Sequence, residues 1–404
     1  MVRTIITLIP SVLVLFLSVV DLQAQQYRVD VTAGIFDRLD TIVSFQMPDA
    51  VEAGVYRMSS ESGSPRFVQV SAEGEAVFIL DRLAAGESRT YQLSLENVEE
   101  PAGVVAGMDE NTITFQSGER QIFSYIHGTN NLPESLDDRY RRGGYIHPLY
   151  SPDGVLLTNH LNTEVHAHHY GIWSAWTNTR FQGRTPDFWN VHLNSGRVDN
   201  VKGLDAHWDG PVHGGFRARH YFTDLSSSTP VIALNEEWDV SVYRSPESGT
   251  YHQFDLQVSQ TTNSGQPLVL PEYHYGGVGF RGHIDWDDPE NATFLTSEGL
   301  GRDGHATRVR WTHIGGHSDG ELAGVAIFSH PENYRHPQTV RIHPSEPFFN
   351  YAPAQLGEMS IEPGSPYIVR YRFVTYDGDP DPDQLNRMWN DFAYPPGVTV
   401  IKQE

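Results

Sequence analysis

Cysteine is absent from the 404-residue chain. Its absence excludes a disulfide framework, a thiol nucleophile, a thiolate metal site and a lipoprotein anchor. Lysine is nearly absent as well, since only Lys202 and Lys402 are present. The fold must therefore be stabilised by the burial of its side chains and not by covalent cross-links.

Positive charge is scarce, because the formal net charge at pH 7 is −23. A strongly acidic surface repels nucleic acids and anionic membranes at long range, which argues against both as partners. No Gly-Lys-Ser/Thr loop for cradling phosphate is present, and the glycine-rich segments 277–282 and 299–304 do not open a helix of a βαβ unit. We therefore expect no nucleotide cofactor.

The first 126 residues contain neither histidine nor tryptophan. All 19 histidines lie between His127 and His343, and all eight tryptophans lie from Trp173 onward. Imidazole is the side chain most easily poised to move a proton or hold a metal near neutral pH. The distribution predicts a scaffold in the first part of the chain and a functional site in the second.

Residues 1–24 have the pattern of a secretory signal. Arg3 lies near the start, an apolar run covers 5–20, and a small-residue cleavage site follows at 22–24. The run is short for a membrane span and no second run follows, so we expect no stable membrane insertion. An exported chain without disulfides favours a bacterial periplasm or the cell exterior.

The rest of the chain exceeds an ordinary domain of about 100–200 residues. A break rich in Glu, Pro and Gly at 99–103 divides it. We expect a small N-terminal β module at 25–105, a larger domain at 106–396 and a C-terminal tail at 397–404.

Apolar and polar residues alternate along most of the chain, as is typical of half-buried β-strands. The alternation predicts short strands near 29–32, 41–45, 76–80 and 90–95, and longer ones at 216–222, 231–243, 251–261, 324–329, 348–352 and 367–375. Only 382–392 has helical spacing. We predict an all-β protein, in which a large antiparallel two-sheet sandwich follows a small β-sandwich module.

Several short motifs occur along the larger domain. They are YIHPLYSPDG at 145–154, HHYGIW at 168–173, DFW at 187–189, EYHYGG at 272–277, GVAI at 324–327, HPEN at 330–333 and PFF at 347–349. Together they resemble an uncharacterised bacterial family, DUF6807, formerly labelled methane-oxygenase-like, over about residues 120–395. The family has a third histidine where this chain has Tyr170. A membrane copper enzyme would need membrane spans, so the older label does not describe the chemistry.

The strand-rich domain is also similar to the galactose-mutarotase type of supersandwich. In that fold a concave sheet presents histidines and carboxylates to a sugar. The similarity is one of fold alone. It implies a carbohydrate partner, either an oligosaccharide or a glycoside.

The catalytic candidates combine imidazoles that move a proton with carboxylates that orient an imidazole or remove a proton. They are His147, His168, His169, Asp187 and Glu272. Residues 272–274 alternate as in a strand, which would place Glu272 and His274 on one face. The alternative is that these histidines are hydrogen-bonded core or turn residues.

A metal site is the second interpretation of the same histidines. If 166–169 is extended, His166 and His168 point to one face and His169 to the other. The first two would then bind zinc with a third ligand from His147, His160 or Asp187. No helical His-Glu-x-x-His signature or comparable spacing supports this set. We therefore expect no required cofactor, with a divalent metal as the alternative.

The substrate-binding candidates are rings that stack on a sugar, an arginine that binds a carboxylate or sulfate, and polar groups at strand ends. They are Tyr170, Trp173, Trp189, His274, Arg281, His330 and Asn333. The alternatives are core packing for Trp173, a surface salt bridge for Arg281 and a structural turn for His330.

These patterns predict an exported carbohydrate-active enzyme that cleaves a glycosidic linkage by hydrolysis or β-elimination. Epimerisation or mutarotation of a sugar would use the same histidines and carboxylates without cleaving a bond. A non-catalytic carbohydrate-binding or cell-surface module would need only the aromatic rings and the polar contacts.

Overall fold

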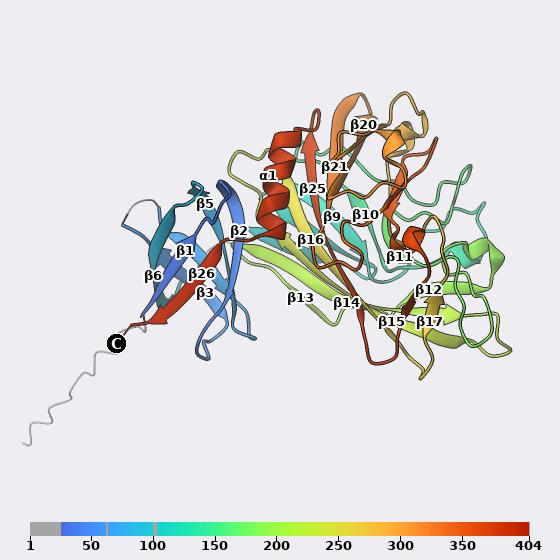
Figure 1. Ribbon diagram of the computed structural model, residues 1–404, viewed down its shortest axis with the longest axis horizontal. Coiled ribbons are helices and arrows are strands. Elements are labelled where there is room, and N and C mark those ends of the chain that lie inside the picture. Colours follow the sequence, from blue (N-terminus) through green and yellow to red (C-terminus); the bar gives the residue numbers. More distant parts are fainter. Residues whose placement is uncertain (1–25, 62–63, 100–102, 404) are drawn as a thin grey trace, which may run out of the picture.

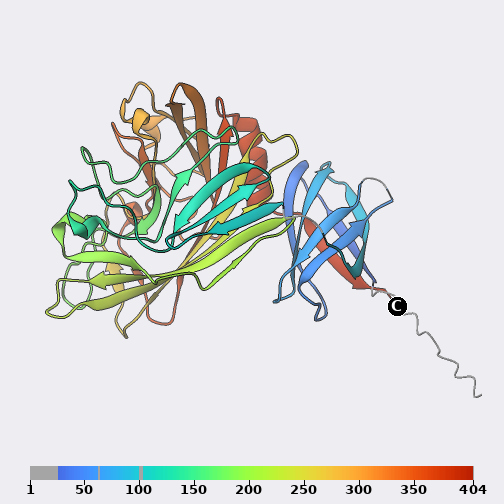
Figure 2. The ribbon, with the colours of Figure 1, turned by 180° about the vertical axis from the view of Figure 1, so that it is seen from behind.

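The computed structural model describes residues 26–61, 64–99 and 103–403, so the expected signal segment lies outside the described residues. Within them the chain is built mostly of antiparallel strands, with one α-helix, α1 (Pro382–Ala393). Two large sheets lie against each other, and a smaller sheet lies at one end of this sandwich (Figures 1 and 2). The prediction of an all-β sandwich is confirmed.

The first large sheet has nine strands. Its path runs β12 (Gly196–Asn200), β14 (His213–Asp224), β15 (Val231–Tyr243), β16 (His252–Thr262), β25 (Tyr367–Asp377), β21 (Glu321–Ser329), β20 (Trp311–Ser318) and β19 (Thr293–Thr296), and β13 (Ala206–Trp208) pairs with β14. In β15, Trp238, Val240 and Val242 are buried in the core. This period of two is the pattern that predicted the strand.

The second large sheet has eight strands. Its path runs β22 (Val340–Ile342), β23 (Phe348–Tyr351), β18 (Gly277–Arg281), β11 (Ile172–Ala175), β10 (Tyr145–Leu149), β9 (Arg120–Ile126), β8 (Thr112–Ser117) and β7 (Val104–Met108). A separate pair joins β17 (Leu268–Leu270) to β24 (Met359–Ile361). Because β7 begins at Val104, the larger domain starts slightly before the expected residue 106.

The main hydrophobic core fills the space between the two large sheets. Ile146 and Ile172 enter it from the eight-stranded sheet, and Phe254 and Phe373 enter it from the nine-stranded sheet. The last two rings stack with their centroids 4.7 Å apart. Burial of each such side chain contributes about 1.5–3 kcal/mol, which is how a chain without disulfides holds two sheets together.

The N-terminal module is one seven-stranded sheet with its own core. Its path runs β2 (Arg38–Gln46), β5 (Glu75–Leu83), β4 (Arg66–Val70), β3 (Gly54–Ser59), β6 (Ser88–Asn97), β1 (Gln26–Thr32) and β26 (Gly397–Lys402). The expectation of a C-terminal tail is wrong, because β26 pairs along the whole of β1, with Val29 opposite Val400. The chain thus returns to its first module at its end (Figure 1).

Helix α1 confirms the only helix that the sequence predicted. Leu385, Met388, Trp389 and Phe392 are buried, and they share a core cluster with residues of β21 and β25. The side chain of Asp381 accepts hydrogen bonds from the amides of the first turn. This N-cap satisfies donors that have no partner within the helix.

The N-cap leads to a first prediction. Asp381→Ala should lower the free energy of unfolding by about 1 kcal/mol, because the capped amides lose their acceptor. Denaturant titration of the purified chain measures the change. The exposed neighbour Asp379 provides a matched control, and Asp379→Ala should stay within about 0.5 kcal/mol. Equal effects of the two substitutions would contradict the assignment of the cap.

One predicted strand is absent. Residues 272–274 form an irregular segment before β18, so the alternation of EYH does not reflect a strand. Pro271 precedes the segment and cannot donate a ladder hydrogen bond, while Gly276 and Gly277 follow it with φ of 141° and 99°. These residues break the extended ladder, and the segment forms a loop.

No helix in the described residues is both long and apolar enough to cross a membrane.

Candidate functional site

The histidine-rich segment between β10 and β11 is a turn. His166 adopts a left-handed φ of 51°, and the His169 amide donates a hydrogen bond to the His166 carbonyl at 2.9 Å. Asn162 Oδ1 starts the turn by accepting the amides of Glu164 and Val165 at 3.0 and 3.3 Å. Asparagine competes with regular structure in this way. The extended conformation expected for 166–169 is therefore wrong.

The turn brings three imidazoles together that a strand would have separated. The ring of His169 lies 5.0 Å from that of His166 and 4.8 Å from that of His168, measured between centroids. The expectation that His169 points away from the other two is wrong for the same reason.

The elements that carry the site are adjacent in the eight-stranded sheet, where β22, β23, β18, β11 and β10 follow one another. Ile172 of β11 points into the core between the sheets, and its neighbour Trp173 belongs to a second buried cluster on the opposite face. Loops from these strands cover that second face. Residues far apart in the sequence meet there.

A cavity of about 190 Å³ opens on this face. It is lined by His166, His168, His169, Trp189, Asn190, His274, Tyr275, Arg341, His343 and Phe348. Typical sites for drug-sized ligands measure about 300–1,000 Å³, so this cavity suits a small ring better than an extended ligand. Of the residues predicted to form a site, it brings together His168, His169, Trp189 and His274, with His166 of the alternative metal set.

Aromatic packing fixes the orientation of His169. Its ring stacks on Trp173 and Phe348, with centroids 5.0 and 4.8 Å away. The side chain is only 5% exposed, and its Nδ1 is buried without a hydrogen-bond partner among the described residues. An unpaired buried nitrogen costs free energy, and of the residues that line the cavity His169 and Arg341 each have one.

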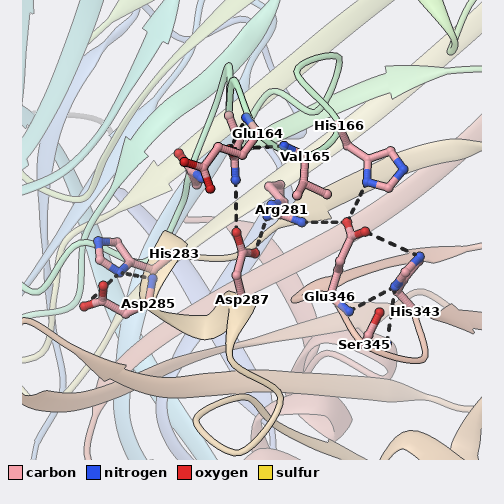
Figure 3. A network of polar contacts seen from close by, with 12 residues as sticks. Glu164, Val165, His166, Arg281, His283, Asp285, Asp287, His343, Ser345 and Glu346 are labelled. Carbon is pink, nitrogen blue, oxygen red and sulfur yellow. Dashed lines mark hydrogen bonds and ion pairs between the residues drawn. The ribbon is translucent and has the colours of Figure 1, made fainter.

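A charged network lies beside the cavity (Figure 3). Glu346 Oε2 accepts a hydrogen bond from Arg281 Nη1 at 2.9 Å and contacts His166 Nδ1 at 2.8 Å. The Nη2 atom of Arg281 pairs with Asp287. His343 Nε2 lies 3.8 Å from Glu346 Oε1. Burial raises the pKa of Glu346, but the hydrogen bond from His166 and the charge of Arg281 outweigh it and lower the pKa overall.

Arg281 has an internal role in this network in place of the expected contact with substrate. It is 1% exposed and lies between two carboxylates. Its positive charge is therefore balanced within the protein. It positions Glu346 next to the histidines.

Burial keeps three of the imidazoles at the cavity neutral near pH 7. Burial lowers the pKa of His168 to about 3, helped by His166 and His192. Burial also lowers the pKa of His343 to about 4 and that of His169 well below its ordinary value. Neutral imidazole offers a lone pair, so these rings can accept a proton or bind a metal.

Buried histidines predict acid lability. Burial lowers the pKa of His160 to about 4 and that of His313 to about 3, as it does for His168. Unfolded imidazoles protonate near pH 6.5, so the unfolded chain binds more protons below that pH. Each such group should lower the free energy of unfolding by about 1.4 kcal/mol per pH unit between about pH 6.5 and 4. Denaturant titrations at falling pH measure the slope, and a stability that holds or rises would contradict it.

Arg341 brings an unpaired cation to the cavity. None of the ion pairs among the described residues involves it, and its Nε is buried without a hydrogen-bond partner there. Burial lowers its pKa, against the opposing effects of Tyr275 and Glu346. A half-buried guanidinium without an anion is suited to a carboxylate or sulfate of a ligand.

Asp187 shapes a loop instead of facing the cavity. Its Oδ1 accepts the amides of Trp189 and Asn190 at 2.9 and 2.8 Å, and its Oδ2 accepts Thr177 Oγ1 at 3.0 Å and Asn190 Nδ2 at 2.8 Å. These bonds occupy both oxygens. Asp187 thus positions two lining residues in place of the expected catalytic role.

Glu272 is exposed in the loop before β18 and does not line the cavity, so the predicted pairing of Glu272 with His274 on one strand face is wrong. His274 reaches the cavity from that loop. Burial lowers its pKa.

Three further candidates do not line the cavity. His147 bonds Thr158 Oγ1 at 2.9 Å and stacks on His160 with centroids 3.9 Å apart. Tyr170 is buried under the guanidinium of Arg142, which lies 4.9 Å from its ring centre. Trp173 packs in the second buried cluster, which matches the alternative of core packing given for it above.

The HPEN motif lies at the end of β21, near α1 and away from the cavity. His330 packs on Phe392 with centroids 5.0 Å apart. Asn333 donates to the Arg370 carbonyl at 2.9 Å and to Ser329 Oγ at 3.1 Å. The motif is a structural turn, the alternative stated for His330.

Sequence reasoning missed half of the lining residues and the adjacent carboxylate. They are Asn190, Tyr275, Arg341, His343, Phe348 and Glu346. The sequence did hold a signal, because Glu346 directly precedes the PFF motif at 347–349 and His343 lies three residues before Glu346.

A larger cavity, of about 400 Å³, lies between the N-terminal sheet and the sandwich. No histidine lines it. Arg66 pairs there with Asp81, whereas Arg244 takes part in no ion pair among the described residues and burial raises the pKa of Asp40. Size and an unpaired arginine favour this cavity, whereas the cluster of histidines with lowered pKa values favours the smaller one. We consider the histidine cavity the candidate site.

Fold and cavity together define an all-β, two-sheet sandwich protein with a histidine-lined pocket. The chain belongs to the DUF6807 family, described as a family of unknown function, whose model matches residues 112–390. The resemblance seen in the motifs is thus confirmed. No curated protein matches the chain.

Two solved structures from Enterococcus faecalis are similar at low levels. One is described as an alpha-mannosidase from strain V583, with 7% identity, a TM-score of 0.39, and coverage of 95% of this chain and 46% of that one. The other is described as a protein in the Glycosyl Hydrolase Family 38, with 7% identity, a TM-score of 0.37, and coverage of 95% and 48%. The chain spans about half the length of each.

Proposed function

We propose that the protein is an exported carbohydrate-active enzyme that cleaves a glycosidic linkage of an acidic sugar by β-elimination in the histidine cavity. The observation that carries the proposal is the combination of Arg341, which has no ion-pair partner among the described residues, with the neutral imidazole of His168 and aromatic rings around one small cavity. Trp189, Tyr275 and Phe348 offer apolar faces to a sugar ring.

Elimination fits the cavity better than hydrolysis does. Most glycoside hydrolases use two carboxyl groups about 5–9.5 Å apart across the bond. Among the described residues that line the cavity there is no Asp or Glu. The adjacent Glu346 is bound to Arg281 and His166. Elimination needs instead a cation for the sugar carboxylate and a base for the neighbouring proton.

Arg341, His168 and Tyr275 each have one role in this reaction. Arg341 binds the carboxylate and makes the neighbouring C–H more acidic. His168 removes that proton, the electron pair forms a carbon–carbon double bond, and the bond to the glycosidic oxygen breaks. Tyr275 donates a proton to the leaving oxygen; Asn190 Nδ2 holds its hydroxyl at 3.0 Å. A bound carboxylate also raises the pKa of His168 towards neutrality, which strengthens the base.

A screen of the purified protein against acidic and neutral oligosaccharides, with mass detection, tests the proposal. Elimination gives two products whose masses sum to that of the substrate, whereas hydrolysis adds one water. A change of isomer at constant mass would indicate epimerisation instead. Binding without any product would indicate a carbohydrate-binding module.

Arg341→Met gives a specific prediction. The loss of a charged hydrogen-bond partner should lower kcat/KM for an acidic substrate by about 10- to 150-fold, which corresponds to about 1.5–3 kcal/mol. Arg341→Lys should retain more activity because it keeps the charge. The exposed Arg197 pairs with Asp199 on the surface, so Arg197→Met should leave kcat/KM unchanged. An Arg341→Met enzyme as active as this control would rule out the assigned role.

A further inference from the structure

We propose that His166, His169 and Glu346 bind a divalent transition-metal ion, for which Zn²⁺ is the chemical match. Two imidazoles with one carboxylate form a common ligand set for catalytic zinc. This inference goes beyond the proposed elimination and does not depend on the sugar.

The three side chains already converge. One potential ligand atom from each residue lies within 4.8 Å of the other two. Bonds of about 2.1 Å in a tetrahedral site place ligand atoms about 3.5 Å apart. The remaining adjustment is small, and His166 can make it because its side chain is 40% exposed at the tip of the turn.

A second observation points to a ligand at the same place. His169 is 5% exposed and lines the cavity, yet its Nδ1 has no hydrogen-bond partner among the described residues. Metal-binding histidines use one ring nitrogen for the ion and the other for a supporting contact. Aromatic stacking on Trp173 and Phe348 holds the plane of the His169 ring here.

The surroundings hold the carboxylate in position. Arg281 Nη1 donates to Glu346 at 2.9 Å and is itself bound to Asp287. His343 Nδ1 accepts the amide of Glu346 at 3.0 Å, so in the neutral ring Nε2 carries the proton and faces the carboxylate. His343 is therefore a positioning residue and not a ligand. Metal ligands are commonly held by such neighbours.

The ligand set differs from the one that the sequence suggested. His147 and His160 stack on each other outside the cavity, and Asp187 is occupied within its own loop. Among the described residues, His166, His169 and Glu346 are the group of potential ligands that converges.

Equilibrium dialysis of the purified chain against Zn²⁺, with metal content measured by mass spectrometry, tests the site. We expect about one Zn²⁺ per chain. His166→Asn and Glu346→Gln should weaken binding by about 100-fold or more, and the former should fold because His166 is exposed. His317→Ala removes an exposed histidine of β20 and should bind as the unmodified chain does.

Zn²⁺ binding that is absent, or equally tight in His166→Asn and His317→Ala, would overturn the inference. His169→Gln is a second ligand variant, with the same expectation, and circular dichroism checks the fold of each. Zn²⁺ binding without cleavage of any sugar would leave the metal site standing and remove the proposed function. Sugar cleavage by a chain that binds no Zn²⁺ would remove the metal site and leave the proposed function standing.

Discussion

Replacing His168 with alanine is expected to lower kcat on an acidic oligosaccharide by about 10²- to 10⁴-fold, the range that a general base contributes. The side chain lines the cavity, is 6% exposed and is kept neutral by burial. Loss of a proton acceptor should leave substrate binding largely unchanged. The expected signature is therefore a fall in kcat with little change in KM.

His192 provides the matched control for this variant. Its ring lies 5.7 Å from that of His168, but it is exposed and does not line the cavity. His192→Ala should retain nearly full activity. His168→Gln, which keeps most of the side-chain volume, should be as inactive as His168→Ala. An active His168→Gln enzyme would show that volume matters and that proton transfer does not.

Arg281→Met is expected to lower the free energy of unfolding by about 3 kcal/mol. The guanidinium is 1% exposed, and its removal leaves Asp287 and Glu346 without their shared cation. Breaking a buried ion pair typically costs about 3–5 kcal/mol, and we take the low end because Asp287 is 29% exposed. Denaturant titration near pH 7 measures the change.

The pH dependence of the free energy of unfolding distinguishes the loss of this shared cation from a simple loss of packing. The pKa of Glu346 is lowered in the fold, so its contribution to stability is present above its unfolded pKa and is lost as the pH falls through the folded value. The deficit of Arg281→Met should therefore shrink in acid. Adding Glu346→Gln to Arg281→Met should recover part of the stability at neutral pH. A deficit that is constant with pH would indicate packing alone.

Short-range sequence patterns predicted many elements of the fold. Strand β15 was predicted with its observed bounds, and α1 was predicted to within one residue, because alternation and helical spacing are properties of neighbouring residues. The pairing of β26 with β1 was missed. That contact joins the two ends of the chain, and no short-range pattern encodes it.

The candidate site was predicted in part. His168, His169 and Trp189 were found because they lie in dense, distinctive motifs. Arg341 and Glu346 were missed because the hairpin of β22 and β23 brings them beside β18, and sheet order cannot be read from spacing. The wrong orientation of His169 came from assuming a strand where Asn162 starts a turn.

Cleavage of an acidic oligosaccharide in isotopically labelled water, followed by mass analysis, separates elimination in the histidine cavity from hydrolysis. Elimination breaks the glycosidic bond without adding water, so the account predicts products without the heavy oxygen and with masses that sum to that of the substrate. It also predicts that the same products nearly disappear with His168→Ala and persist with His192→Ala. Incorporation of one labelled oxygen per cleavage, or unchanged turnover in His168→Ala, would contradict the account.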